Sequence, residues 1–270
     1  MNIQGLPIIG MLVTRNEEDI IAEVMEEYSR HFDAIYCLDS SDDKTPDIIS
    51  SFKVVKWIIK DKDLGIPLTQ LKDGKRQFLL SKVQEDFGYE GWIFSIQGDE
   101  MFYGDIEKIA LFAEDEKANV INCLPAHFVI HISEKDTIEE EDTKISIQQR
   151  RLWYFLAFCE NAGFRNQGGL YYNLSEHMRT IPHEFQPMRT CSKVIIRRHY
   201  NMRSVKQVKD RIEDRVSSGW QPNYKHIKDN FFISNPRQIF IDGELYSEIQ
   251  KFDGEFKFAK EHEGLYNLLI

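Results

Sequence analysis

The chain has 270 residues, of which 42% are hydrophobic and 29% are charged, and this is the composition of an ordinary globular protein. Its formal net charge of −10 argues against general nucleic-acid binding, because such binding needs a basic surface that displaces counterions. No apolar run approaches the roughly 20 residues of a membrane-spanning helix. The first residues also lack the basic and apolar regions of a signal peptide, so we expect a cytoplasmic protein whose four scattered cysteines are reduced thiols.

Strand-like and helix-like patterns alternate over the first 125 residues. Continuous apolar runs predict buried strands at 7–13, 34–38, 54–59, 91–96 and 119–124. Amphipathic or capped stretches predict helices at 16–28, 45–49, 75–86 and 104–113. Asn16 is expected to cap the first of these helices. Parallel strands need crossover helices between them, so the alternation predicts an α/β fold with a mostly parallel sheet.

The pattern loses its regularity after residue 125. The strongly acidic stretch 134–142 predicts a solvated loop rather than a metal site, and 147–200 shows no clean periodicity. Ser204 then begins a helix with a capping-box pattern, for which Gly219 is the expected stop. The many aromatic residues of the last fifty positions are expected to cover the sheet. We therefore expect an irregular or helical C-terminal extension.

Acidic residues directly follow two of the predicted strands. Asp39 begins the polar run 39–45, and Asp99 and Glu100 follow the strand at 91–96. Open α/β sheets bind ligands at the carboxyl ends of their strands, and carboxylate oxygens suit a divalent cation that bridges phosphates. A turn with a helix cap is the alternative for Asp39, because such residues are common after strands. The adjacent Asp99 and Glu100 repel each other unless a cation or proton compensates, which favours metal or phosphate chemistry there.

Three segments, 9–18, 39–45 and 92–102, together resemble the family-2 glycosyltransferases. The resemblance covers about the first 110 residues, with the motifs in the family's order. It implies the GT-A fold, a Rossmann-like mostly parallel sheet with flanking helices, and transfer of a sugar from a UDP or GDP donor to a glycan or other hydroxyl acceptor. It also implies inversion at the sugar and assistance by Mn²⁺ or Mg²⁺. Residues 1–125 would then bind the sugar donor, and 126–270 the acceptor, in one compact unit.

The resemblance implies a nucleotide pocket at the ends of the first two strands. Thr14, Arg15 and Glu17 would line this pocket, and Asp39 would accept a hydrogen bond from the base. Arg76 would contact the pyrophosphate or the base, with a solvated helix arginine as the alternative.

The same resemblance makes Asp99 a ligand of the divalent cation. Gln97 stands where the family's Asp-x-Asp signature has its first acid, so the chain departs from the family pattern there. An amide can still hydrogen-bond a ribose hydroxyl, but the departure weakens the expectation of metal dependence.

Residues of the second half resemble the family more loosely. Glu176 is the expected base that deprotonates the acceptor, followed by His177 and Glu184, and a salt-bridged loop is the alternative for each. His199 would complete the metal shell or bind phosphate, with a packed core histidine as the alternative. Arg203 would stabilise the leaving diphosphate through paired donors. The basic helix that follows is expected to be solvated, with peripheral contact to an anionic membrane as the alternative.

Two other functions remain open on the sequence alone. A sugar-nucleotide nucleotidyltransferase has a related fold, but the first strand here ends in Thr14-Arg15-Asn16-Glu17 rather than in a glycine-rich loop. A non-catalytic homologue that binds a nucleotide is the other alternative, and Gln97 is the residue that supports it.

Overall fold

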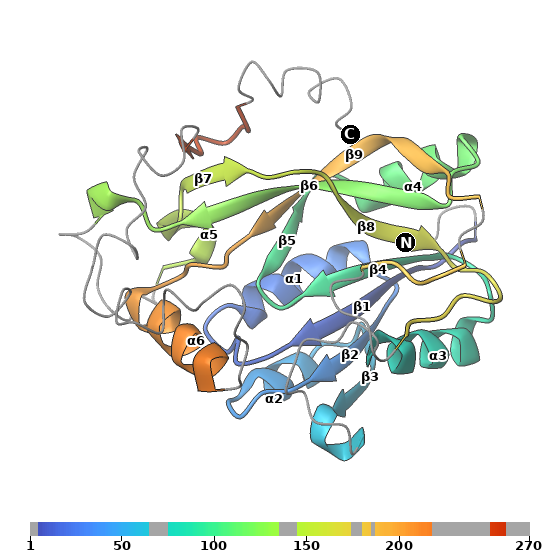
Figure 1. Cartoon of the computed structure of the whole chain (residues 1–270), viewed down its shortest axis with the longest axis horizontal. Helices are drawn as coiled ribbons and strands as arrows, with labels where there is room; N and C mark the ends of the chain where they lie inside the picture. The colour runs from blue at the N-terminus through green and yellow to red at the C-terminus, as the bar shows by residue number, and fades with distance from the viewer. Residues whose placement is uncertain are drawn as a thin grey trace. The chain divides into compact units, whose positions relative to one another are not determined.

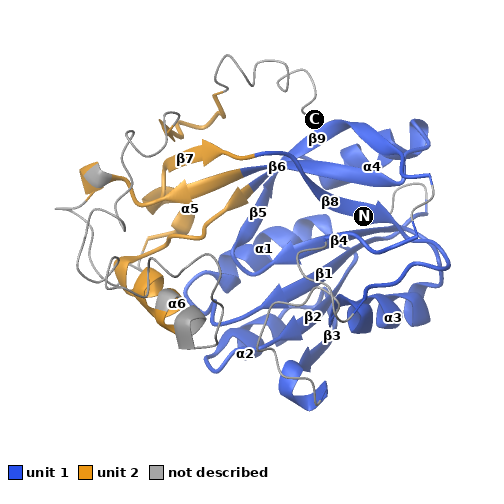
Figure 2. Cartoon of the chain, in the orientation of Figure 1, with its two compact units in different colours: residues 1–125, 158–197, 265–270 blue, residues 126–157, 198–264 orange. Residues whose placement is uncertain are grey.

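The computed structural model in Figure 1 describes residues 5–64, 75–134, 145–173, 180–184, 187–217 and 249–257. The chain forms two compact units, which Figure 2 distinguishes by colour. Unit 1 contains Met1–Pro125, Phe158–Arg197 and Leu265–Ile270, and unit 2 contains Ala126–Ala157 and Arg198–Gly264. The division between the units first falls after Pro125, and residues 158–197 belong to unit 1. The assignment of the two halves to sugar donor and acceptor stays a prediction.

Unit 1 contains a parallel sheet of four strands in the order β3-β2-β1-β4. The strands are β1 (Ile8–Thr14), β2 (Ala34–Asp39), β3 (Val55–Lys60) and β4 (Trp92–Gln97). Every residue of β2 is buried, and so is nearly all of β1 and β4, which explains their continuous apolar runs. The predicted α/β fold with a Rossmann-like parallel sheet is thus confirmed.

Helices cover both faces of this sheet. The α-helices described in unit 1 are α1 (Ile21–His31), α2 (Thr45–Ser50), α3 (Arg76–Phe87) and α4 (Ile106–Asp115). One core cluster joins Leu79, Leu80 and Val83 of α3 to Met11 of β1 and Leu38 of β2. On the other face Phe32, which follows α1, lies 6.0 Å from Phe94 of β4 between ring centroids. These contacts follow from the alternation of side chains along each strand.

The first helix begins later than the sequence predicts. Asn16 has a φ of 53°, a left-handed conformation that asparagine tolerates better than most residues, and it lies in the loop after β1. Helical residues start at Ile21 instead. The expectation that Asn16 caps the helix was therefore wrong, because Asn16 forms part of the loop and Ile20 occupies the N-cap position.

The rest of unit 1 is antiparallel or mixed. β8 (Glu160–Arg165) pairs antiparallel with β4 and with β6 (Val120–Val129), while β5 (Glu100–Tyr103) pairs with β9 (Thr190–His199). The unit boundary divides β6 after Pro125 and β9 after Arg197. The sequence did not predict β5 and β8, because they are short and carry mixed side chains.

Unit 2 contains β7 (Trp153–Leu156), which pairs antiparallel with the end of β6 and with β10 (Gln250–Lys251). Its helices are α5 (Ile147–Arg150) and α6 (Val205–Ser217). Aromatic side chains form its core, and Phe252 and Phe256 near the C-terminus pack on Phe128 and Tyr154, as the sequence predicts. The predicted cap of α6 is also present, because Ser204 Oγ accepts the Gln207 N–H at 3.0 Å.

Three features that the sequence predicts lie largely or wholly in segments that the structure does not describe. Most of the acidic stretch 134–142, Gly219 and the aromatic residues from 231 to 240 lie outside the described residues. Within the described ranges, no helix has the length and apolar character that crossing a bilayer requires. All four cysteines are free thiols, as predicted; three of them are buried and Cys159 is exposed.

Candidate functional site

The carboxyl ends of β1 and β2 are joined by the side chain of Asp39. Thr14 Oγ1 donates to Asp39 Oδ1 at 2.9 Å, and Ser41 Oγ donates to the same oxygen at 2.7 Å. The Ser41 backbone N–H donates to Asp39 Oδ2 at 3.2 Å. Asp39 has no exposed surface, and a buried carboxylate needs such donors. The structure therefore shows the turn role for Asp39, and its contact with a base stays a prediction.

The loops after β1 and β2 are also bonded to each other along their length. The Asn16 N–H donates to Ser41 Oγ at 2.9 Å, and the Glu17 N–H donates to Thr45 Oγ1 at 2.8 Å. The Glu18 N–H donates to an Asp43 carboxylate oxygen at 3.2 Å. Three successive N–H groups are thus satisfied by side chains, so this loop does not offer them to a phosphate. The same bonds fix the backbone from which Arg15 and Glu17 project.

A tight turn, Gly98-Asp99, connects β4 to β5 and packs against the end of β1. A Cβ on Gly98 would lie 2.8 Å from Thr14 Cγ2 and 3.0 Å from Glu17 Cγ, so any larger residue would force these side chains to shift. Asp99, the predicted metal ligand, is 1% exposed. The structure thereby brings three predicted site residues, Thr14, Glu17 and Asp99, to the carboxyl ends of β1 and β4.

The second carboxylate of this turn has a partner that sequence reasoning missed. Arg197 of β9 places its Nη1 3.1 Å from Glu100 Oε1 and 3.0 Å from Oε2, with both side chains almost fully buried. Its Nε and Nη2 contact Cys123 Sγ at 3.1 and 2.6 Å. Burial opposes the charge on Arg197, but Cys123 and Glu100 outweigh it and raise the pKa of Arg197. The available signal was an arginine directly after the apolar run 194–196, because buried arginines are almost always paired.

Gln97 faces Glu100 as well. Its Nε2 donates to Glu100 Oε1 at 3.1 Å, and its backbone carbonyl accepts from the Tyr28 hydroxyl at 3.0 Å. Burial, followed by the charge of Glu100, raises the pKa of Tyr28, so this hydroxyl keeps its proton and donates it. The predicted contact between Gln97 and a ribose stays a prediction.

The Gly98-Asp99 turn fits a divalent cation whose coordination shell is completed by oxygen atoms of a bound substrate. Among the described residues, no group of three or more His, Cys, Asp or Glu side chains could hold a metal ion. Mg²⁺ is commonly bound by one or two carboxylates together with substrate phosphates, and carboxylates also suit Mn²⁺. Asp99, a hard oxygen ligand at a strand end, fits that pattern, whereas a cage built from protein side chains alone does not.

Basic side chains lie at the end of β3 and the start of α3. Lys75 Nζ pairs with Asp61 Oδ1 at 2.8 Å, with both side chains largely buried. Arg76, the first residue of α3, is 6% exposed. The solvated alternative for Arg76 is thereby excluded, and its contact with a pyrophosphate stays a prediction.

Glu176 and His177, the predicted bases, lie outside the described residues. The chain on either side of them is fixed to unit 1. The Tyr172 hydroxyl donates to the Thr180 carbonyl at 3.0 Å, and Ser95 Oγ of β4 donates to the same carbonyl at 2.5 Å. Glu184, the third candidate, is exposed and has a φ of 72°. The roles of all three residues stay predictions.

His199 and Arg203 belong to unit 2. The His199 ring lies 4.9 Å from the ring of His127 between centroids. Arg203 is 1% exposed, and its Nη1 donates to the Tyr200 carbonyl at 3.2 Å. The roles that the sequence predicts for His199 at a metal and for Arg203 at a diphosphate stay predictions.

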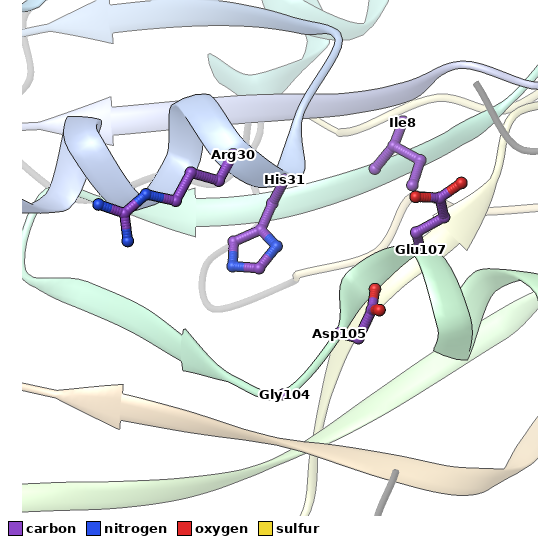
Figure 3. Close-up of a pocket in the computed structure, with 6 residues that line it drawn as sticks. All are labelled: Ile8, Arg30, His31, Gly104, Asp105 and Glu107. Atoms are coloured by element: carbon purple, nitrogen blue, oxygen red, sulfur yellow. The ribbon is translucent and has the colours of Figure 1, made fainter. Parts of the chain in front are cut away.

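A pocket of about 270 Å³ lies at the opposite edge of the parallel sheet. It is lined by Ile8, the first residue of β1, by Arg30 and His31 of α1, and by Asp105 and Glu107 at the start of α4 (Figure 3). The predicted site residues at the carboxyl ends of β1, β2 and β4 are not among those that line it.

Comparisons with known proteins do not assign a family. No family model matches the chain, and no curated protein matches its sequence. Among solved structures, mannosyl-3-phosphoglycerate synthase from Rubrobacter xylanophilus is 16% identical, with a TM-score of 0.33, and the match covers 54% of this chain and 47% of that one. A putative glucose-1-phosphate thymidylyltransferase from Bacillus anthracis, in complex with sucrose, is 14% identical, with a TM-score of 0.26 and coverage of 45% and 55%.

The chain thus spans about half the length of each of these two structures. The α/β fold class rests on the strand order and the parallel registers of β1 to β4.

Proposed function

We propose that the protein is a GT-A-type glycosyltransferase that moves a sugar from a nucleotide-diphosphate sugar to an acceptor hydroxyl. One observation carries the proposal: the loops after β1, β2 and β4 meet at one edge of the parallel sheet. Thr14 bonds to Asp39 across the first two strand ends, and Gly98 packs directly against Thr14 and Glu17. The strand order reverses between β1 and β4, and open α/β sheets bind ligands at such a point.

Asp99 would hold Mn²⁺ or Mg²⁺ together with the diphosphate of the sugar donor. A bound cation would offset the charge that develops on the departing diphosphate. Arg15 and Glu17, on the fixed loop after β1, would line the nucleotide pocket, and Arg76 would contact the pyrophosphate. An inverting displacement also needs a base for the acceptor proton, and Glu176 is the proposed group, with His177 and Glu184 as alternatives.

The hydrogen bonds of Asp39 favour a base with one N–H donor. A carboxylate has about four acceptor positions. In the structure Oδ1 accepts two bonds and Oδ2 accepts one, which leaves one position on Oδ2 among the described contacts. Uracil offers a single ring N–H, whereas guanine offers two adjacent donors that need both oxygens. We therefore propose a UDP-sugar over a GDP-sugar, with a shift of the side chains that cover Asp39 when the base binds.

A nucleotidyltransferase is less well supported. Such an enzyme must bind the triphosphate of a nucleotide, and oriented backbone N–H groups are the common means. The N–H groups of Asn16, Glu17 and Glu18 are instead bonded to side chains of the loop after β2. Incorporation of label from a nucleoside triphosphate and a sugar phosphate, without sugar transfer, would reverse this ranking.

The direct test is sugar transfer, or hydrolysis of the sugar donor, across a panel of UDP- and GDP-sugars with and without Mn²⁺. Asp99→Asn should lower turnover by at least about a hundredfold if its cation stabilises the leaving group. Asp115→Asn, which changes an exposed carboxylate at the end of α4, is the matched control and should keep the wild-type rate. Equal turnover in both variants would remove the role of Asp99. Nucleotide binding without turnover on any acceptor would favour the non-catalytic alternative.

A further inference from the structure

We propose that Arg197 is a built-in cation for Glu100 and withholds this carboxylate from any divalent ion bound at the β4–β5 turn. The consequence is that the turn binds such an ion well only together with a diphosphate. The identity of the diphosphate rests on the proposed function, but the pairing of Glu100 with Arg197 does not.

The geometry shows that Glu100 is held from two sides. Arg197 Nη1 lies 3.1 Å from Oε1 and 3.0 Å from Oε2, and Gln97 Nε2 donates to Oε1 at 3.1 Å. The side chains of Arg197 and Glu100 are 2% and 4% exposed, so water does not screen the pair. A divalent ion that recruited Glu100 would have to compete with a desolvated guanidinium.

Arg197 is itself fixed and cannot follow Glu100 toward a ligand. Its Nε and Nη2 contact Cys123 Sγ on β6 at 3.1 and 2.6 Å. Its Nη2 also lies 3.4 Å from the Asn161 carbonyl on β8. The guanidinium therefore contacts residues of both β6 and β8, and its Nη1 is the nitrogen that donates to Glu100. A rigid counter-ion of this kind keeps the carboxylate in one orientation.

The charge balance of the turn follows from this arrangement. Asp99 and Glu100 together carry two negative charges, and Arg197 cancels one of them. At most Asp99 then remains in this turn as a carboxylate ligand for a divalent ion, and a lone carboxylate is a weak site for Mg²⁺ or Mn²⁺. Diphosphate oxygens would supply the missing charge and ligands. This explains physically why adjacent carboxylates coexist in a buried turn without a preformed metal cage among the described residues.

The test measures binding of Mn²⁺ alone to the full-length protein by electron paramagnetic resonance, with folding checked by circular dichroism. Arg197→Met releases Glu100, and we expect Mn²⁺ to bind this variant at least about tenfold more tightly than wild type. Glu100→Gln in the same background should abolish the gain. Equal or weaker Mn²⁺ binding by folded Arg197→Met would overturn the proposal.

If Arg197→Met does not fold, a second comparison of variants tests the same proposal. The double variant Glu100→Gln/Arg197→Met removes both charges of the buried pair, which is tolerated far better than removal of one. If Glu100 is not a ligand, the double variant should bind Mn²⁺ with UDP or GDP within about threefold of wild type, whereas Asp99→Asn should lose at least about tenfold. A loss in the double variant as large as that of Asp99→Asn would overturn the proposal.

These experiments separate the inference from the proposed function. If wild type binds neither UDP nor GDP in the presence of Mn²⁺, the proposed function fails. The comparison of Mn²⁺ alone between wild type, Arg197→Met and the double variant still decides the role of Arg197, because it involves no nucleotide.

Discussion

Thr14 and Asp39 are the last residues of two neighbouring parallel strands, they face each other in the register of the sheet, and their side chains are hydrogen-bonded at 2.9 Å. The bond joins the loops that follow β1 and β2 at the edge where ligands of open α/β sheets bind. Its location makes Asp39 both a structural residue and a candidate for contact with a nucleotide.

Asp39→Ala should lower the free energy of unfolding by about 1–3 kcal/mol, because it leaves buried hydroxyl and N–H donors of Thr14 and Ser41 without their acceptor. Urea denaturation followed by circular dichroism measures the change. Asp42→Asn, at an exposed position of the same loop, is the control and should change stability by less than about 0.5 kcal/mol. Equal stabilities of the two variants would show that Asp39 does not join the loops.

Gly98→Ala should lower stability by about 1–3 kcal/mol, because the added methyl group would lie 2.8 Å from Thr14 Cγ2 and 3.0 Å from Glu17 Cγ. It should also weaken nucleotide binding, since relief of the clash displaces the turn that carries Asp99. Gly168→Ala is the matched control, because its Cβ would lie 3.6 Å from the nearest atoms of Tyr89, an ordinary contact. Thermal unfolding of the two variants is measured with and without UDP. A Gly98→Ala variant with the stability and UDP response of wild type would contradict the close packing of this turn.

Arg197→Met should lower stability by about 3–5 kcal/mol, because it leaves the Glu100 charge buried without its counter-ion. Adding Glu100→Gln should recover most of this loss, so the double-mutant cycle should give a strong coupling. Lys206→Met is the control, because its ion pair with Asp210 is more than half exposed and such pairs contribute about 0–1 kcal/mol. Additive effects of the two substitutions would exclude a direct pairing of Glu100 and Arg197.

The thiols should differ in reactivity in the folded protein. Burial raises the pKa of Cys123 to about 11 and also raises the pKa of Cys37, so both stay protonated and shielded at neutral pH. Cys159 is exposed and should react first with a thiol reagent. Mass spectrometry after timed alkylation distinguishes the sites, with Cys159→Ser as the control that should remove the fast phase. Rapid labelling of Cys123 in the folded protein would contradict its burial.

The raised pKa of Cys123 also predicts a loss of stability in alkaline solution. In the unfolded chain a cysteine titrates near pH 8.5. Between that value and about 11 the folded state therefore binds more protons at Cys123 than the unfolded state does, so stability falls as the pH rises. Cys123→Ser should make this alkaline decline shallower in urea denaturation measured from pH 8 to pH 10.

The parallel half of the fold was predictable because its strands are buried on both faces. Such strands appear in the sequence as unbroken apolar runs, and the observed bounds of β1 and β2 differ from the predicted ones by one residue. β5, β7 and β8 were missed because they are four to six residues long and their pairing depends on neighbours distant in the chain. Propensity alone does not identify such strands.

The candidate site was predictable in part for a similar reason. Asp39 and Asp99 interrupt apolar runs at strand ends, and their positions are visible in the sequence. The ion pair between Glu100 and Arg197 was not visible in the sequence, because the two residues are 97 positions apart. They meet only through the pairing of β5 with β9. The left-handed conformation of Asn16 was also hidden, because asparagine suits both a helix cap and a loop.

The central claim is that Asp99 and a divalent cation hold a nucleotide diphosphate at the carboxyl edge of the parallel sheet. Isothermal titration of UDP and GDP into wild type, Asp99→Asn and Asp115→Asn, each with and without Mn²⁺, tests it most directly. We predict UDP binding that requires Mn²⁺ in wild type and Asp115→Asn and that is weakened at least about tenfold in Asp99→Asn. Binding of neither nucleotide to wild type, or equal binding to all three proteins, would contradict the claim.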